Sequence, residues 1–267
     1  MDLGLQGRVA FVAGASGGLG YATAQQLAEE GARVAIASRN PARIDAAAQS
    51  IREAVPGAVV LPIVCDVTDE AAIAQALATA ADTFGGLNIL ITNAGGPPSG
   101  PLNSFAAEAW RKALDLNLMS TINLCRHALP YLEAAAEAGL ARILMITSIS
   151  AKQPIAGLAL SNTARAGVQG YAKSLAEELG PQGITVNTVL PGYTKTDRLG
   201  ELAERIRAQT GQSLEAIEAG WAEANALKRL ASPDEFAAAV VFLASARASY
   251  ITGTAMVVDG GRSKHLL

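Results

Sequence analysis

Seven short runs rich in apolar and β-branched residues divide the chain, and most are apolar throughout instead of at alternate positions. They are RVAFVAG (8–14), RVAIAS (33–38), VVLPIV (59–64), LNILIT (87–92), RILMIT (142–147), ITVNTVL (184–190) and AMVVDG (255–260). Amphipathic stretches of helical length, such as 21–30 and 71–85, separate them. Strands of this kind are buried on both faces. The pattern therefore predicts an α/β fold, a doubly wound parallel seven-stranded sheet with helices on both faces.

The organisation along the chain predicts a single domain over residues 1–267. Half of the residues are hydrophobic, which suffices for one large core, and no repeat or Pro/Gly-rich linker marks a boundary. One polar, helix-prone segment at about 197–228 interrupts the alternation between the sixth strand and the next helix. We interpret it as a helical cap over a ligand site, with a plain surface excursion as the alternative.

Charge and cysteine content narrow the classes of partner. The formal charge is −3 and no Lys/Arg-rich run occurs, so neither a nucleic acid nor an anionic membrane surface is expected as a partner, and a small-molecule substrate is favoured. Cys65 and Cys125 stand outside any C-x-x-C spacing, which favours two buried thiols over a disulfide or a metal site. With no signal-like start and no run long enough to cross a bilayer, a cytoplasmic location is expected.

A glycine-rich turn follows the first predicted strand and precedes a helix. It reads Gly14-Ala-Ser16-Gly17-Gly18-Leu19-Gly20. Glycines permit a tight turn in which backbone N–H groups approach a pyrophosphate at the positive end of the helix. A merely structural turn is the alternative. In this strand–turn–helix context, the pattern favours a dinucleotide site.

The spacing G-x-x-x-G-x-G resembles the fingerprint of the short-chain dehydrogenase/reductase family. Further matches follow in that family's order: Asp66 in CDVTD, Asn93-Ala94-Gly95, Asn117 in LDLNL, Ser148 in ITSIS, Pro191-Gly192 and the closing ITGTAMVVDGG. The resemblance implies a Rossmann-like domain, nicotinamide dinucleotide binding and a homotetramer or homodimer. It assigns to the cofactor the glycine turn together with Ser38, Arg39, Asp66, Val67, Asn93, Ala94, Gly95, Arg165, Pro191, Gly192, Thr194 and Thr196.

The residues after the second strand discriminate between the two nicotinamide dinucleotides. An acidic residue there accepts from the ribose 2′-OH of NAD, whereas the 2′-phosphate of NADP needs cationic donors. This chain has Ser38-Arg39. We therefore expect a preference for NADP(H), with NAD(H) possible and Arg39 as a solvated loop charge the alternative.

The family's catalytic pair is replaced. The resemblance implies that Asn117 supports a water chain, that Ser148 orients the substrate oxygen, and that a Tyr-x-x-x-Lys pair supplies the proton. At the expected position stands Ser161-Asn-Thr-Ala-Arg165, and no other Tyr-x-x-x-Lys occurs. A serine hydroxyl is a far weaker acid than a phenol, and arginine stays protonated, so neither takes the family role unchanged. Arg165 could bind ribose hydroxyls, and Ser161 could donate a hydrogen bond or cap its helix. The Ser-Asn-x-x-Arg variant resembles that of some members similar to β-ketoacyl carrier-protein reductases.

Two other residues are candidates for the proton donor. Lys152 lies four residues after Ser148 in the sequence, and Tyr193 follows Pro191-Gly192. The alternatives to a role as proton donor are that Lys152 is an exposed loop residue and that Tyr193 packs against the cap.

Two functions remain open. The first is an NADP(H)-dependent oxidoreductase that reduces a carbonyl or imine by hydride transfer with altered proton delivery. The second is a catalytically silent NADP(H)-binding sensor or partner subunit. A lyase resembling the halohydrin dehalogenases is disfavoured, because those enzymes keep the tyrosine and lack the dinucleotide glycines.

Overall fold

The computed structural model describes residues 1–265 and contains one seven-stranded parallel sheet in the order β3-β2-β1-β4-β5-β6-β7. Its strands are β1 (Val9–Ala13), β2 (Arg33–Ser38), β3 (Val60–Val64), β4 (Ile89–Thr92), β5 (Ala141–Ile146), β6 (Ile184–Pro191) and β7 (Ala255–Val258). All seven predicted strands are present. The predicted Rossmann-like, doubly wound sheet is thereby confirmed.

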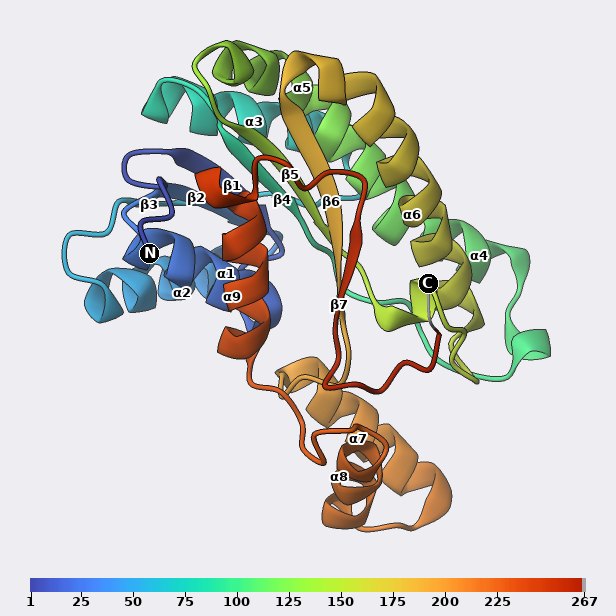
Figure 1. Ribbon diagram of the computed structural model, residues 1–267. Helices are drawn as coiled ribbons and strands as arrows, with labels where there is room; N and C mark the ends of the chain where they lie inside the picture. The colour runs from blue at the N-terminus through green and yellow to red at the C-terminus, as the bar shows by residue number, and fades with distance from the viewer. Residues whose placement is uncertain (266–267) are drawn as a thin grey trace.

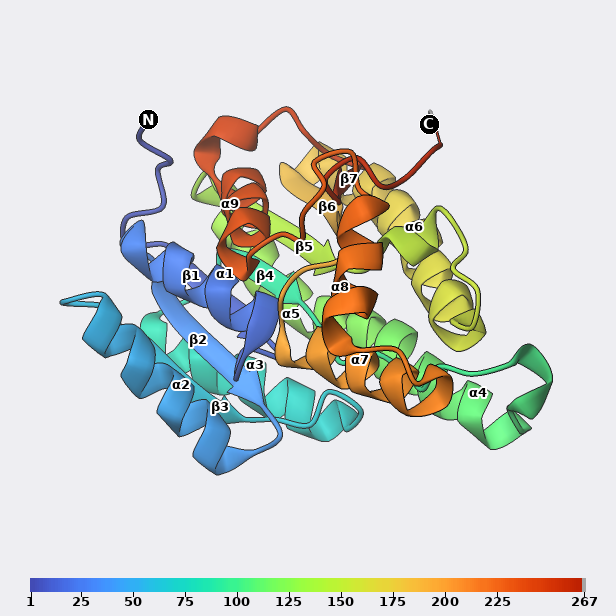
Figure 2. The ribbon, with the colours of Figure 1, turned by 90° about the horizontal axis from the view of Figure 1, so that it is seen from below.

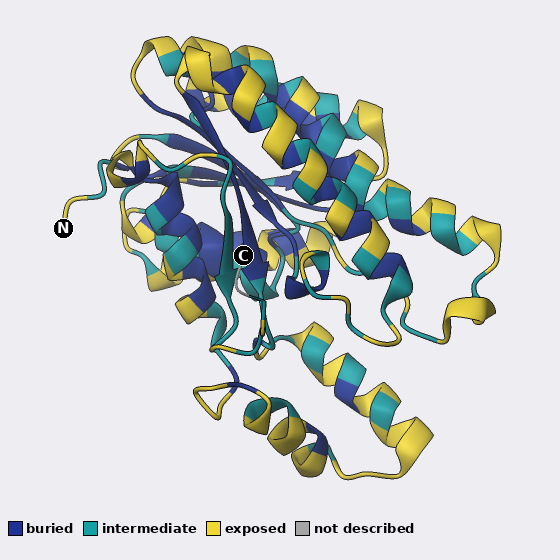
Figure 3. Ribbon diagram, turned by 45° about the vertical axis from the view of Figure 1, so that its right-hand side comes forward, coloured by how far each residue is buried: buried dark blue, intermediate teal, exposed yellow. Residues whose placement is uncertain are grey.

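Helices cover both faces of the sheet (Figure 1). One face packs against α1 (Gly18–Glu29), α2 (Pro41–Ala54) and α9 (Pro233–Ala244), and the other against α3 (Glu70–Phe84), α5 (Ser120–Glu137) and α6 (Ala159–Leu179). The core accordingly consists of two apolar layers separated by the sheet. Figure 3 shows the inner strands of the sheet buried and the helices buried only along their inner sides, whereas the edge strands β3 and β7 are partly or wholly of intermediate burial. This is the burial that continuous apolar strands and amphipathic helices require.

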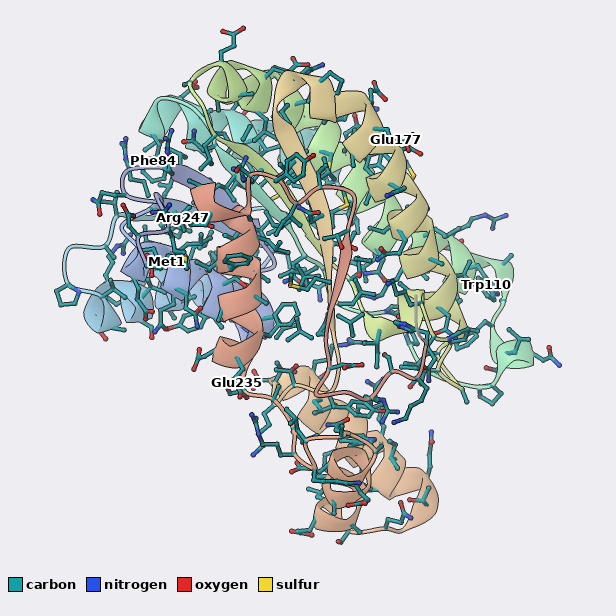
Figure 4. All side chains as sticks on the ribbon, in the orientation of Figure 1. Met1, Phe84, Trp110, Glu177, Glu235 and Arg247 are labelled. Carbon is teal, nitrogen blue, oxygen red and sulfur yellow. The ribbon has the colours of Figure 1, made fainter. Side chains whose placement is uncertain are left out.

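Local sequence signals set where several helices begin. Pro41 follows Asn40, whose side chain accepts a hydrogen bond from Arg43 N and caps α2. At α9, Ser232 and Glu235 form a reciprocal capping box. Figure 4 places Glu235 at the end of α9 that approaches the segment between β6 and α9.

The segment between β6 and α9 forms two helices, α7 (Asp197–Thr210) and α8 (Leu214–Glu223). Figure 2 looks onto the carboxyl end of the sheet and shows both helices lying across it. The helical character predicted for residues 197–228 is therefore present over most of that range. On the side of the sheet that carries α6, α4 (Ala107–Leu114) runs into a π-helical turn at Asp115–Met119 and then into α5.

Both cysteines are buried, as the sequence predicts. Burial raises the pKa of the Cys65 thiol to about 11 and that of the Cys125 thiol to about 12, so neither is a thiolate near neutral pH. Within residues 1–265, no helix is long and apolar enough to cross a membrane, and no group of three or more His, Cys, Asp or Glu side chains could hold a metal ion.

Candidate active site

The glycine turn lies where β1 and β4 are neighbours and their following helices pack on opposite faces of the sheet. At such a switch point, the loops diverge and leave a crevice at the carboxyl ends of the strands. Gly14 has φ +61°, and a Cβ there would meet the Asn93 carbonyl oxygen at 2.9 Å. Asn93 Nδ2 donates to the Gly14 carbonyl at 3.1 Å and ties the two loops together. A Cβ on Gly20 would meet the same Gly14 carbonyl at 2.5 Å. Both positions therefore require glycine, because neighbouring backbone atoms leave no room for a Cβ.

The first turn of α1 is open to an anion. Its N-cap, Gly17, makes no side-chain capping bond, and the first turn contains no acidic side chain. The free N–H groups and the helix dipole favour negative charge at this point. Thr196 packs against Gly18, since its methyl carbon would lie 3.4 Å from a Cβ on Gly18. These features fit the pyrophosphate of a dinucleotide.

Arg43 extends this anion-binding region, and our sequence analysis did not identify it. Its guanidinium would lie 3.5 Å from a Cβ on Gly17, and it pairs with Asp197 of α7 at 3.7 Å. The available signal was a second arginine four residues after Arg39, in the first turn of α2.

Four residues predicted to bind the cofactor, those at or just after the ends of β2 and β3, lie beside the main cavity and not on its wall. Ser38 is buried, Arg39 is exposed, and Asp66 and Val67 are half-buried at the end of β3. Hydrogen bonds from Thr68 lower the pKa of the Asp66 carboxyl below its usual value, and the positive charge of Arg39 contributes to this shift. Arg39 is thus close enough to Asp66 for electrostatic interaction.

One cavity of about 420 Å³ runs from the glycine turn to α7. Most of the sequence-predicted residues line this cavity, and they lie at the ends of β1, β4, β5 and β6 and on α6. The predicted residues on its wall are Gly14, Ser16, Gly17, Gly18, Leu19, Asn93, Ala94, Gly95, Ser148, Ser161, Arg165, Pro191, Gly192, Tyr193, Thr194 and Thr196. Gly20, Asn117 and Lys152 are not on the wall.

Ser148 and Ser161 reach the cavity wall from the loop after β5 and from α6. Ser148 ends the loop after β5, and its hydroxyl accepts a hydrogen bond from Ser150 N at 3.1 Å. The Ser161 hydroxyl lies 3.4 Å from the buried Ser150 hydroxyl. Ser161 is the third residue of α6, whose N-cap is Leu158, so the capping role considered for Ser161 is wrong. Its hydroxyl instead faces a polar neighbour at the cavity wall.

Arg165 is buried one turn further along α6. Its Nη1 donates to the carbonyl oxygens of Thr147 at 2.8 Å and Ile146 at 3.5 Å. Burial, with a smaller contribution from the nearby Arg198, lowers the pKa of Arg165 to about 10. It stays cationic at neutral pH, and no carboxylate in the described part of the chain pairs with it. Arg165 therefore contributes an uncompensated positive charge.

Asn117 is buried behind the cavity in the π-helical turn. Its Nδ2 donates to the Gly95 carbonyl at 2.6 Å. Its buried Oδ1 has no hydrogen-bond partner among residues 1–265. A buried unpaired carbonyl is costly and is commonly satisfied by an ordered water molecule.

The two candidate proton donors differ in placement. The Tyr193 ring lines the cavity and stacks on Trp221 of α8 with 4.9 Å between ring centroids. Its hydroxyl accepts from Arg262 at 3.4 Å. Lys152 is exposed and does not line the cavity. Of the two, only Tyr193 lines the cavity.

Comparisons with known proteins agree with this arrangement. Residues 14–263 match the family described as Enoyl-(Acyl carrier protein) reductase. The short-chain reductase protein NovJ of Streptomyces niveus is 36% identical over 257 residues, which are 96% of this chain and 94% of NovJ. L-Sorbose reductase of Gluconobacter frateurii, solved with NADPH and L-sorbose, has a TM-score of 0.93 at 33% identity and full coverage of both chains.

A third structure bears on the altered catalytic pair. It is an NADPH-bound short-chain oxidoreductase of Pseudomonas aeruginosa PAO1 that contains an atypical catalytic centre, with a TM-score of 0.88, 35% identity and 97% coverage of both chains. The extent of these matches identifies the chain as a member of the short-chain dehydrogenase/reductase family, a family of oxidoreductases.

Proposed function

We propose that this protein is an NADP(H)-dependent reductase of a small carbonyl or imine compound in which the proton is not delivered by a phenol on α6. The observation that carries the proposal is the single cavity that joins the glycine turn to Ser148, Ser161 and Arg165. It is supported by the NADPH bound in the similar sorbose reductase and Pseudomonas oxidoreductase.

The chain's own residues fit the cofactor. Gly17, Gly18 and the first turn of α1 would bind the pyrophosphate, and Arg39 and Arg43 would bind the 2′-phosphate. Arg165 would bind the nicotinamide ribose from α6. When bound, NADPH supplies a hydride from its nicotinamide ring to the electrophilic carbon.

The protein must then stabilise and protonate the acceptor atom. Ser148 and Ser161 place two hydroxyl donors on the cavity wall, and the nearby Arg165 cation favours negative charge developing on a carbonyl oxygen. Reduction of a ketone adds the hydride to carbon and one proton to oxygen, which gives an alcohol. We assign delivery of that proton to Tyr193 or to water bound by the two serines, because Lys152 lies away from the cavity.

A turnover screen tests this function. The purified protein should bind NADPH more tightly than NADH and should consume NADPH with at least one ketone, aldehyde or cyclic imine. Binding of NADPH with no consumption across the screen would contradict the proposal and favour the silent sensor or partner subunit. Equal binding of both dinucleotides would contradict the cofactor assignment.

A further inference from the structure

The inner face of α7 presents cations to the cavity. Arg198, Leu202 and Arg205 all line it, together with Glu201. Arg198 and Arg205 are seven residues apart, which places them two turns apart on one face of the helix. At 1.5 Å per residue, their backbone positions are separated by about 10 Å along the axis. The two guanidinium groups thus bracket one stretch of the cavity.

Neither guanidinium forms a salt bridge with a carboxylate within residues 1–265. The cation Arg207, on the same helix, pairs with Glu204 at 2.7 Å, and Arg43 pairs with Asp197. Arg198 instead donates to the Pro97 carbonyl at 3.4 Å, and Arg205 Nε donates to the Glu201 carbonyl at 3.3 Å. Each guanidinium has five N–H donors, so most remain available to a ligand.

The phosphates of the cofactor do not account for these cations. The groups proposed for the cofactor's phosphates lie at Gly17 and Gly18 for the pyrophosphate and at Arg43, beside Gly17, for the 2′-phosphate. The Arg198 guanidinium lies instead against Gly96, in the loop after β4, where a Cβ would collide with it. Arg205 is two helical turns farther from the start of α7. The cations therefore belong to the part of the cavity beyond the glycine turn.

The charge balance indicates the kind of ligand. The α7 residues on the cavity wall include the anions Asp197 and Glu201 and the cations Arg198 and Arg205. Asp197 is paired with Arg43, so the remaining positive charges of Arg198 and Arg205 exceed the negative charge of Glu201 by one. This excess matches a monoanion better than a dianion such as a phosphate monoester. A planar carboxylate also fits the fork of N–H groups on a guanidinium.

We propose that the substrate carries a carboxylate, held by Arg198 and Arg205, in addition to the group that is reduced beside Ser148 and Ser161. The proposal rests on the proposed function for the position of the reacting group. Binding of the carboxylate can be measured without turnover, so the two proposals can fail separately.

The test is a calorimetric titration of the NADP⁺-saturated protein with matched acids and amides. The probes are 4-acetylbenzoate against 4-acetylbenzamide, and 5-oxohexanoate against 5-oxohexanamide, which differ in reach. At least one acid should bind about ten- to hundredfold more tightly than its amide, as one charge-assisted contact provides. Arg198→Gln should remove most of this preference, and Arg198→Lys should retain part of it. Arg207→Gln, on the same helix but outside the cavity wall, should leave it unchanged.

The outcomes separate the alternatives. Equal binding of acid and amide, no binding of any acid, or an unchanged preference in Arg198→Gln would overturn the carboxylate proposal. Loss of NADPH affinity in Arg198→Gln with the preference intact would assign Arg198 to the cofactor and overturn it as well. Tight binding of a keto acid that is never reduced would sustain the anion site and count against the reductase function.

Discussion

Replacing Gly14 by alanine tests the close approach of the two loops that form the cofactor crevice. Gly14 has φ +61°, a left-handed conformation that costs a residue with a Cβ about 1–2 kcal/mol. The new Cβ would also lie 2.8 Å from Asn93 Nδ2 and 2.9 Å from the Asn93 carbonyl oxygen. Because one of these atoms belongs to the backbone of the next loop, the strain cannot be relieved by rotating a side chain.

A matched glycine separates the steric part of the stability loss from the part due to backbone conformation. Gly57 has φ +85°, is exposed and would have no atom within 4 Å of an added Cβ. The loss of stability in Gly57→Ala should therefore come only from the left-handed backbone conformation. Forced overpacking typically adds about 1–3 kcal/mol, so Gly14→Ala should lose about 2–5 kcal/mol in total.

The measurement is the free energy of unfolding in urea for the two variants, with NADPH affinity measured by fluorescence titration. Gly14→Ala should be less stable than Gly57→Ala by about 1–3 kcal/mol and should bind NADPH more weakly, because its loops are pushed apart. Equal losses of stability, or unaltered NADPH affinity in Gly14→Ala, would refute the reasoning about close approach.

Four other substitutions probe separate parts of the site and of the fold. Arg39→Ala should weaken NADPH about ten- to hundredfold in a binding titration and leave NADH nearly unchanged; an equal effect on both would remove Arg39 from the 2′-phosphate site. Tyr193→Phe should slow NADPH-dependent reduction if its hydroxyl delivers the proton, whereas Lys152→Ala should leave the rate unchanged; the reverse result would reassign the donor. Hydrogen bonds from Arg229, then from Ser232, lower the pKa of Glu235 to about 2. Since the folded value lies below the unfolded value, Glu235 stabilises the native state above about pH 4.5. The stability advantage over Glu235→Gln should therefore fade as pH falls toward 2, and a constant difference would contradict the ion pair.

The sheet was predictable because its signal is local. Continuous apolar runs such as 141–146 are buried on both faces whatever the tertiary details, and the glycine turn requires its strand–turn–helix setting. The position of Ser161 and Arg165 on one helical face also follows from their spacing alone.

Contacts between distant segments could not be read in this way. Arg43 borders the glycine turn and reaches Asp197 across the cavity, which depends on how α7 folds over the sheet. The same applies to Arg198, which meets the loop after β4. Lys152 was a candidate proton donor from its sequence position, but it is exposed and does not line the cavity. The orientation of a loop side chain depends on tertiary packing and not on spacing.

The central claim is that Ser161 and Arg165 remove the usual proton donor while hydride transfer is retained. The direct test compares kcat/KM for reduction of one ketone by the unmodified protein and by Ser161→Tyr/Arg165→Lys, with Arg165→Lys alone as the control. A restored phenol–amine pair should raise the rate about 10²- to 10⁴-fold, and the control should gain little, because its lysine has no phenol to activate. No gain in the double variant, together with an unmodified protein that is already as fast as family members with the tyrosine, would contradict the claim.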